Sequence, residues 1–391
     1  LIRRLADRFA PGGFLHYGQG KWYPGETLPR WTFSLYWRRD GKPIWRDNNL
    51  IAKENVDTGA TADDARRLLT SMAKTLGVSE QFALPVYEDP AEWMLRESNL
   101  PDNVIPGDDK LKDPEERARF ARVFERGLGN AVAYVLPIQR WQSRAVAQRW
   151  LSELWSLRRG RIYLAPGDSP AGFRLPLSSL PYVAPSKYPY INPQDPADAR
   201  GPLPDFRFDE PAPTKARKQK APQKTVAAAI AAAGAAGQYV AEQKLDPVTE
   251  HRTEQSIDLS GGAVRTALCV EPRDGRLCVF MPPVETVEDY LELIAAAEHA
   301  AAASGLTVHI EGYPPPNDPR LNVIRVAPDP GVIEVNIHPA HSWEECVETT
   351  TAIYEDARQT RLGADKFLID GRHTGTGGGN HVVVGGATPH D

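Results

Sequence analysis

Residues 306–338 read LTVHIEGYPPPNDPRLNVIRVAPDPGVIEVNIH and contain three predicted strands in succession. Residues 306–311, 321–327 and 332–337 are rich in β-branched side chains, and apolar and polar positions alternate along them. A proline-rich loop separates the first two strands, and a Pro-Gly turn separates the last two. This stretch therefore predicts a sheet with antiparallel neighbours.

Further elements are predicted on both sides of these strands. They are a hairpin at 264–281, helices at 287–304 and 343–361, and strands at 366–370 and 381–384. Antiparallel pairs combined with helices that cover one face are typical of an α+β fold rather than a doubly wound sheet.

Composition divides the chain into three segments. Residues 1–184 form an aromatic-rich α/β region, with helices predicted at 61–76, 90–97, 114–127 and 142–157. Residues 185–258 are Pro-rich and then Ala-rich, include a basic run at 215–220, and predict a partly disordered linker. Residues 259–391 form the regular α+β segment, in which the candidate chemistry lies.

Bulk properties exclude several classes of protein. The 391 residues carry a formal net charge of −5, which gives no basic field for nucleic-acid binding. The longest apolar run, residues 225–237, is mostly Ala and too short to cross a membrane. Three cysteines predict a reduced, cytoplasmic protein. The chain does not begin with Met, and both of its ends predict a fragment of a longer polypeptide.

Two predicted strands carry a carboxylate among apolar neighbours. Glu311 shares a strand face with His309, and Glu334 shares one with Asn336 and His338. A carboxylate near a core usually needs a counter-charge or a metal. The alternative is that both faces simply point at water, as in a one-sided sheet.

A glycine-rich loop, DGRHTGTGGGNH, spans residues 370–381. Backbone without side chains can approach a polyphosphate closely and offer N–H groups to it. Arg372 adds a guanidinium for phosphate oxygens, and His381 is a candidate metal ligand. We expect the two carboxylates and His381 to converge on one cation-and-triphosphate pocket.

The other polar residues in this segment could have either a functional or a purely structural role. Arg320 ends the rigid proline loop and could orient a phosphate or only stiffen the connection. His338 and His341 suggest zinc, but Pro339 prevents the one-face helix geometry of a zinc protease. His341 is better explained as a loop or cap residue, and Cys346 as a buried helix thiol.

Four stretches of the chain resemble the bacterial amidoligase family, which occurs together with transglutaminase-like proteins. They are the opening residues 9–26, VHIEGYPPP at 308–316, DPGVIEVNIHPAHSW at 329–343, and the glycine-rich loop at 370–381. The resemblance implies a glutamine-synthetase-like catalytic core with a mixed or antiparallel sheet. It also implies an ATP- and Mg²⁺-dependent (or Mn²⁺-dependent) ligase that joins a carboxylate to an amine, for example in peptides, through an acyl phosphate.

By this resemblance, Glu311, Glu334 and His381 would hold the metal, and Arg372 would join them in catalysis. The nucleotide would be bound by Gly375, Gly377, Gly378, Gly379, Asn380 and Arg320. Glutamine synthetase has more metal carboxylates than can be placed here, and its later arginines would lie beyond Asp391, so the fragment could be inactive alone.

Two rival functions remain open. The aromatic cluster between Trp22 and Trp37 could bind a peptide or glycan in a non-catalytic module of a transglutaminase-like protein. A metal-dependent hydrolase could use His338, His341 and His381 instead.

Overall fold

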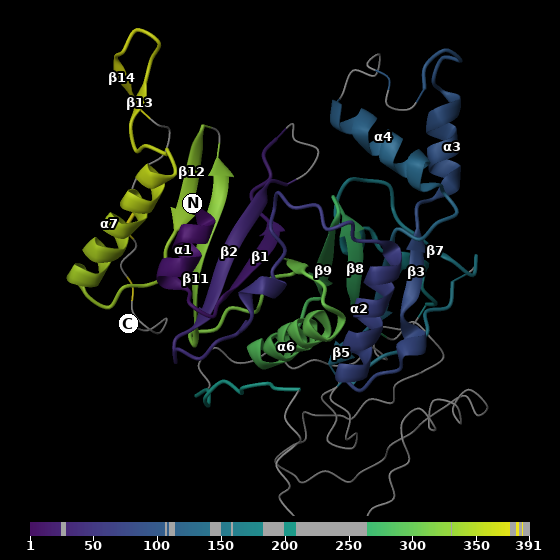
Figure 1. The fold of residues 1–391 in the computed structure, drawn as a ribbon, viewed down its shortest axis with the longest axis horizontal. Helices are drawn as coiled ribbons and strands as arrows, with labels where there is room; N and C mark the ends of the chain where they lie inside the picture. Colours follow the sequence, from purple (N-terminus) through teal and green to yellow (C-terminus); the bar gives the residue numbers. More distant parts are fainter. Residues whose placement is uncertain are drawn as a thin grey trace, which may run out of the picture.

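One mixed sheet of ten strands forms the centre of the computed structural model, with helices on both faces (Figure 1). The structure describes residues 1–24, 29–105, 108, 114–140, 150–157, 159–182, 199–208, 264–329, 331–375, 381, 382 and 385. In spatial order the strands are β12 (Val332–Asn336), β11 (Leu321–Asp329), β2 (Trp31–Arg38), β1 (Phe14–Gln19), β10 (Val308–Gly312), β9 (Arg276–Met281), β8 (Ala267–Arg273), β4 (Ala133–Pro137), β3 (Leu84–Tyr87) and β7 (Ile162–Tyr163).

Strands from the two ends of the chain alternate in this sheet. β1 and β2 lie between β11 and β10, and β8 pairs with β4. The β1–β10, β9–β10 and β3–β7 pairs are parallel, and the other neighbouring pairs are antiparallel. The described residues before position 183 and those from 264 to 375 therefore share one α+β fold.

Helices α2 (Ala62–Thr75) and α6 (Val287–Ser304) cover one face of the central strands. Thr61 and Asp64 form a capping box at the start of α2. α6 has the predicted bounds because Thr286 caps its first turn and Gly305, at φ 65°, ends it. Leu68, Leu293 and Val279 are among the buried residues that join these helices to the sheet.

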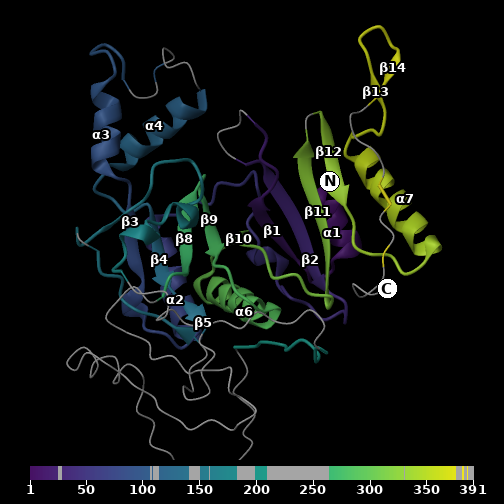
Figure 2. The same cartoon turned by 180° about the vertical axis from the view of Figure 1, so that it is seen from behind.

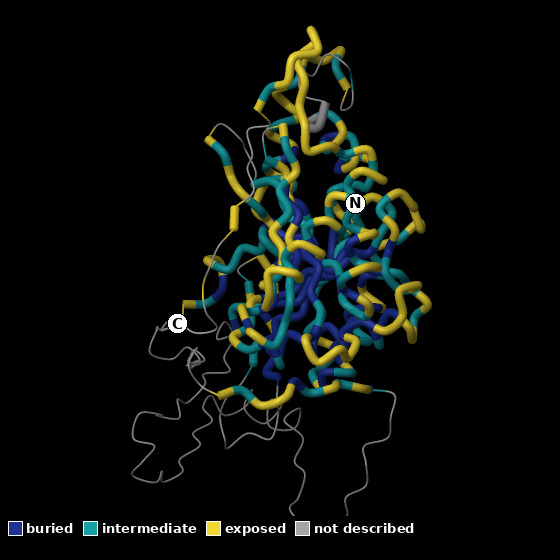
Figure 3. Tube along the Cα trace, turned by 90° about the vertical axis from the view of Figure 1, so that its left-hand side faces the viewer, coloured by how far each residue is buried: buried dark blue, intermediate teal, exposed yellow. Residues whose placement is uncertain are grey.

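Two other helices cover the opposite face at the β12 end of the sheet (Figures 1 and 2). α1 (Ile2–Phe9) and α7 (Trp343–Gln359) pack there around Leu5, Leu35 and Ile324. At the far end, α3 (Pro90–Ser98) and α4 (Pro114–Arg126) form a separate small cluster. Buried positions gather in the middle of the molecule and exposed ones on its outside (Figure 3).

Short elements complete the described fold. They are β5 (Gln139–Arg140), β6 (Trp150–Leu151), β13 (Lys366–Phe367), β14 (His373–Thr374), and the 3₁₀ helices η1 (Asn48–Leu50), η2 (Glu80–Phe82), η3 (Ala171–Arg174) and η4 (Leu177–Ser179). None of the helices in the described ranges is both long and apolar enough to cross a membrane.

Three sequence predictions need correction. The helix predicted at 142–157 is wrong at its described end, where Trp150–Leu151 is strand β6 paired with β5. The strand predicted at 366–370 is only β13, in a hairpin with β14 outside the main sheet. Part of the predicted linker is packed: Leu203 is buried in the core, and Arg38 donates hydrogen bonds to the carbonyls of Leu203 and Pro204.

Candidate functional site

Strand register places Glu311 and Glu334 on opposite faces of the sheet. Residues paired across neighbouring strands point to the same face. The pairs that run outward from Glu311 are Glu311–Tyr17, Tyr17–Phe33, Phe33–Val326 and Val326–Val335. Glu334 is one residue from Val335 and so points the other way. The expectation that these two carboxylates converge is therefore wrong.

Glu311 is buried and ion-paired with Arg273 of β8 through both carboxylate oxygens. Arg273 also donates to Glu271 Oε2 at 3.1 Å and contacts Cys278 Sγ at 3.3 Å. Burial raises the pKa of Glu311, and the Arg273 guanidinium offsets part of that rise. This Glu271–Arg273–Glu311 cluster already supplies the counter-charge that a buried carboxylate needs.

Glu271 and Arg273 were missed from sequence because the predicted strand ended at Val270, before Pro272. In the structure β8 continues through Pro272 to Arg273. The signal that could have shown this is the alternation Cys269, Glu271, Arg273, which puts all three on one face.

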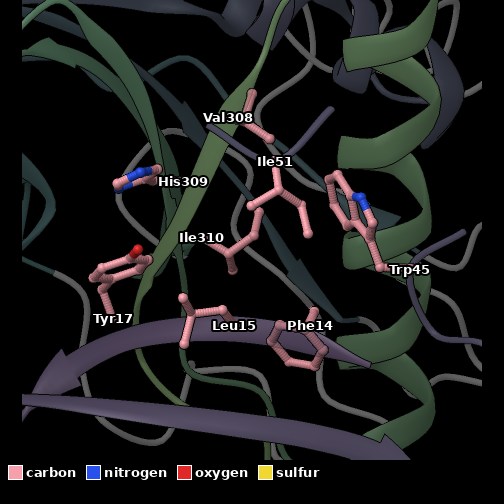
Figure 4. A pocket seen from close by; sticks show the side chains of 8 residues that line it. All are labelled: Phe14, Leu15, Tyr17, Trp45, Ile51, Val308, His309 and Ile310. Atoms are coloured by element: carbon pink, nitrogen blue, oxygen red, sulfur yellow. The ribbon is translucent and has the colours of Figure 1, made fainter. Parts of the chain in front are cut away.

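His309 and Tyr17 lie on the same face as Glu311, on the side of β10 away from Val308 and Ile310 (Figure 4). Their rings stack with centroids 4.5 Å apart, and the Tyr17 hydroxyl donates to Glu54 Oε1 at 2.6 Å. Burial lowers the pKa of His309 to about 4, so its ring is neutral at pH 7. The adjoining cavity, about 10 Å³, is no larger than a single water needs and is no ligand site.

Glu334 lies on what we call the open face, the surface of β1, β2, β11 and β12 that carries Thr32, Ser34, Arg325, Glu334 and Asn336. On this surface Arg325 and Asn336 are exposed and Glu334 is half-buried. Helices α1 and α7 pack on the opposite face, around Leu35 and Ile324. Asn336 Nδ2 donates to Glu334 Oε1 at 2.6 Å.

A second carboxylate meets Glu334 at the end of the β11–β12 hairpin. The Lys21 ammonium lies 2.5 Å from Glu334 Oε2 and 2.9 Å from Asp329 Oδ2. Tyr23 donates its hydroxyl proton to the other Asp329 oxygen. The hydrogen bonds to Glu334 and Asp329 raise the pKa of Lys21, and Tyr23 and Lys21 hold the pKa of Asp329 below its usual range.

His16 lies at the inner end of the open face, paired across β2 with Ser34. The side chain is buried, and its Nε2 has no hydrogen-bond partner within the described chain. Burial lowers the pKa of His16 to about 4. A neutral imidazole with one unpartnered ring nitrogen therefore lies beneath this surface.

The remaining predicted residues are dispersed. Arg320 is held by Asp318 and Glu288, and Arg372 by Asp370 on the exposed β13–β14 hairpin. Gly375 and His381 are exposed, while Gly377, Gly378, Gly379 and Asn380 lie outside the described residues. His338 packs between the rings of Phe9 and Trp37, and His341 contacts Arg39.

No group of three or more His, Cys, Asp or Glu side chains placed to hold a metal occurs in the described part of the chain. The predicted set of Glu311, Glu334 and His381 is not assembled there. The aromatic cluster between Trp22 and Trp37 is likewise divided: Tyr36 is a core residue, whereas Trp22 and Trp31 are exposed.

The fold and its clusters define an α+β protein with a large mixed sheet and charged side chains gathered on both faces. Over residues 1–391 the chain matches the family described as "Putative amidoligase enzyme (DUF2126)", and it belongs to that family. This membership supports a ligase. No curated protein and no solved structure matches the chain.

Proposed function

We propose that the chain is an ATP- and Mg²⁺-dependent carboxylate–amine ligase whose nucleotide site lies on the open face at Asp329 and Glu334. The observation that carries the proposal is the meeting of these two carboxylates at one ammonium group, that of Lys21. Membership in an amidoligase family supports the reaction class.

The two carboxylates suit the coordination preferences of Mg²⁺. Mg²⁺ at nucleotide sites is usually held by one or two carboxylates, with phosphate oxygens and waters completing its coordination. Asp329 and Glu334 would hold the ion here, and it would neutralise charge on the triphosphate. Glu311 is excluded from this set because it lies on the other face, paired with Arg273.

Other side chains of the open face suit the same reaction. Lys21 offers an ammonium and Arg325 an exposed guanidinium, and a guanidinium can bind a phosphate or a carboxylate through two parallel N–H groups. Asn336 orients the Glu334 carboxylate. These residues would act by positioning and by electrostatic stabilisation.

The proposed chemistry has two steps. A substrate carboxylate oxygen bonds to the γ-phosphorus as ADP leaves, which gives an acyl phosphate. The amine nitrogen then bonds to the acyl carbon as inorganic phosphate leaves, and the nitrogen loses a proton. Formation of the first equivalent of ADP should therefore require only the acid, whereas repeated turnover should require both the acid and the amine.

Calorimetric titration with Mg²⁺ and a non-hydrolysable ATP analogue tests the site. The double variant Asp329→Asn/Glu334→Gln should bind at least tenfold more weakly than the unaltered chain. Asp63→Asn, an exposed carboxylate on α2 that is paired with Arg66, is the matched control and should bind normally. Equal binding by all three proteins would place the nucleotide elsewhere.

A non-catalytic binding module is the second candidate, because Trp22, which follows Lys21 in sequence, and Trp31 are exposed and could stack on a ligand. Such a module should keep its ligand in the Asp329→Asn/Glu334→Gln variant and release no ADP. No described cluster favours the metal-dependent hydrolase.

A further inference from the structure

Helix α7 is held to the body of the protein by one side only. Asp356, which is buried, accepts two hydrogen bonds from Arg8 of α1, at 2.8 and 3.0 Å. Ile353 packs on the cluster around Leu5 and Ile324. Of the seventeen residues of α7, only Thr349 and Asp356 are buried. The exposed part of the helix surface includes Trp343, Val347 and Tyr354.

The outward surface carries an apolar stripe, which we call the outer stripe: Trp343, Val347 and Tyr354. Trp343 is 69% exposed and Val347 is 44% exposed. With Thr350, these positions follow the spacing i, i+4, i+7, i+11, which is the a/d seam of a coiled coil. At 3.6 residues per turn they lie within a sector of roughly 60° of the helix. The sequence pattern that would bury one helix against another is therefore exposed.

Acidic side chains flank the outer stripe on one side. Glu344 and Glu348 are exposed there, and Glu355 lies in the same row and pairs with Arg358. Across its whole length α7 carries five acidic residues and one arginine. Two copies of α7 brought together would place like charges at the flanks of the seam, which is unfavourable.

We propose that the outer stripe of α7 is a docking surface for an amphipathic helix of a protein partner, with an apolar a/d seam and Lys or Arg at the flanking positions. Charge complementarity with Glu344 and Glu348 selects a basic helix over a second copy of this chain. The proposal does not depend on the ligase reaction.

The surroundings of α7 support an interaction surface in this region. Nine of the eighteen exposed large hydrophobic residues in the described ranges lie from Ile333 onward. They include Phe367 and Leu368 of the segment that follows α7 and projects with β13 and β14 beyond the sheet (Figure 1). Concentrations of exposed apolar surface of this kind mark sites of interaction.

Fluorescence anisotropy with two labelled peptides tests the proposal. Both are three-heptad helices with Leu at a and d, one with Lys and the other with Glu at e and g. The unaltered chain should bind the Lys peptide at least tenfold more tightly than the Glu peptide. Trp343→Ser/Val347→Ser should weaken that binding at least tenfold. Met94→Ser/Leu95→Ser, which changes exposed apolar residues of α3, is the control and should bind normally.

Charge reversal distinguishes specific binding at the outer stripe from nonspecific hydrophobic association. Glu344→Lys/Glu348→Lys should invert the preference, so that the Glu peptide binds more tightly than the Lys peptide. Equal affinity for both peptides, or binding that survives Trp343→Ser/Val347→Ser, would overturn the proposal. A dimer in sedimentation that the same double variant dissociates would assign the stripe to a second copy and would also overturn it.

Discussion

At Glu311, burial and ion pairing act on the same carboxylate. Arg273 neutralises it and also contacts Glu271, so the cluster holds β8 and β10 together across β9. A buried ion pair adds little net stability when complete, but removal of one partner leaves a buried charge unpaired. Glu311 therefore has a structural explanation that needs no metal.

Glu311→Ala should lower the free energy of unfolding by about 1 to 3 kcal/mol, because it leaves Glu271 as the remaining carboxylate partner of Arg273. Urea denaturation measures this loss. Arg273→Met/Glu311→Leu, which removes both charges, should recover most of it. A loss below about 1 kcal/mol for Glu311→Ala would contradict the structural role, since exposed pairs have values in that range.

Two buried histidines predict a stability change in mild acid. Burial lowers the pKa of His16 and His309 from 6.5 to about 4. Between pH 4 and 6.5 the unfolded chain therefore binds more protons than the folded chain. The free energy of unfolding is unaffected by these two rings above pH 6.5 and falls as the pH drops from 6.5 toward 4. This loss in the free energy of unfolding is about 3 kcal/mol for each histidine.

The measurement is the free energy of unfolding between pH 4 and 7, from urea denaturation at each pH. In His16→Asn/His309→Gln the slope against pH should be clearly shallower than in the unaltered chain. An unchanged slope would mean that both rings are protonated in the folded state.

At the scale of elements, the Asp356 carboxylate ties α7 to α1 through Arg8, with Arg4 at 3.8 Å. The Arg8 side chain holds the pKa of Asp356 below its usual range, so this contribution is present above about pH 4 and is lost as the pH falls through the folded value. Asp356→Asn should speed amide hydrogen exchange throughout residues 343–359 and leave exchange in α6 unchanged. Glu348→Gln, which changes an exposed carboxylate of α7, is the control; equal protection in both variants would argue against the anchor.

The turn between β8 and β9 requires glycine at position 275. Its φ is 69°, and a Cβ there would collide with the Asp57 carboxylate. Gly275→Ala should destabilise the protein by about 1 to 3 kcal/mol more than Gly77→Ala, whose φ is 72° but which has open space around it. Thermal unfolding of the two variants measures the difference, and equal losses would show that Asp57 moves aside without cost.

Element identity was largely predictable where local signals were strong. Thr286 and Gly305 mark the ends of α6, and the prediction of a helix over 287–304 is confirmed. The end of β8 was not predictable from Pro272, because pairing with β9 continues through Pro272 and Arg273, beyond the residues of β8 that pair with β4. The α+β class is confirmed, whereas the glutamine-synthetase-like likeness stays a prediction.

At the scale of the whole molecule, the candidate site could be predicted only in part. Alternation within a strand tells which residues share a face with one another, but not which face of the sheet that is. Glu311 and Glu334 are separated by β1, β2 and β11, and only the register of those strands sets their relative faces. Lys21 and Asp329 were missed because a loop and a hairpin end bring them together without a short motif.

Strands from both ends of the chain contribute side chains to the open face. β1 and β2 supply Thr32, Ser34 and His16, and β11 and β12 supply Arg325 and Glu334. Neither half of the chain carries this surface alone, so the proposed ligase site depends on the complete sheet.

The central claim is that a metal–nucleotide complex binds to the open face and not to the face that carries Glu311. A crystal structure with Mn²⁺ and a non-hydrolysable ATP analogue, with the metal located by its anomalous scattering, tests it most directly. The account predicts a Mn²⁺ peak bound by Asp329 and Glu334, with the Lys21 ammonium displaced toward phosphate. A peak at Glu311 and Glu271, with Arg273 displaced, would contradict it.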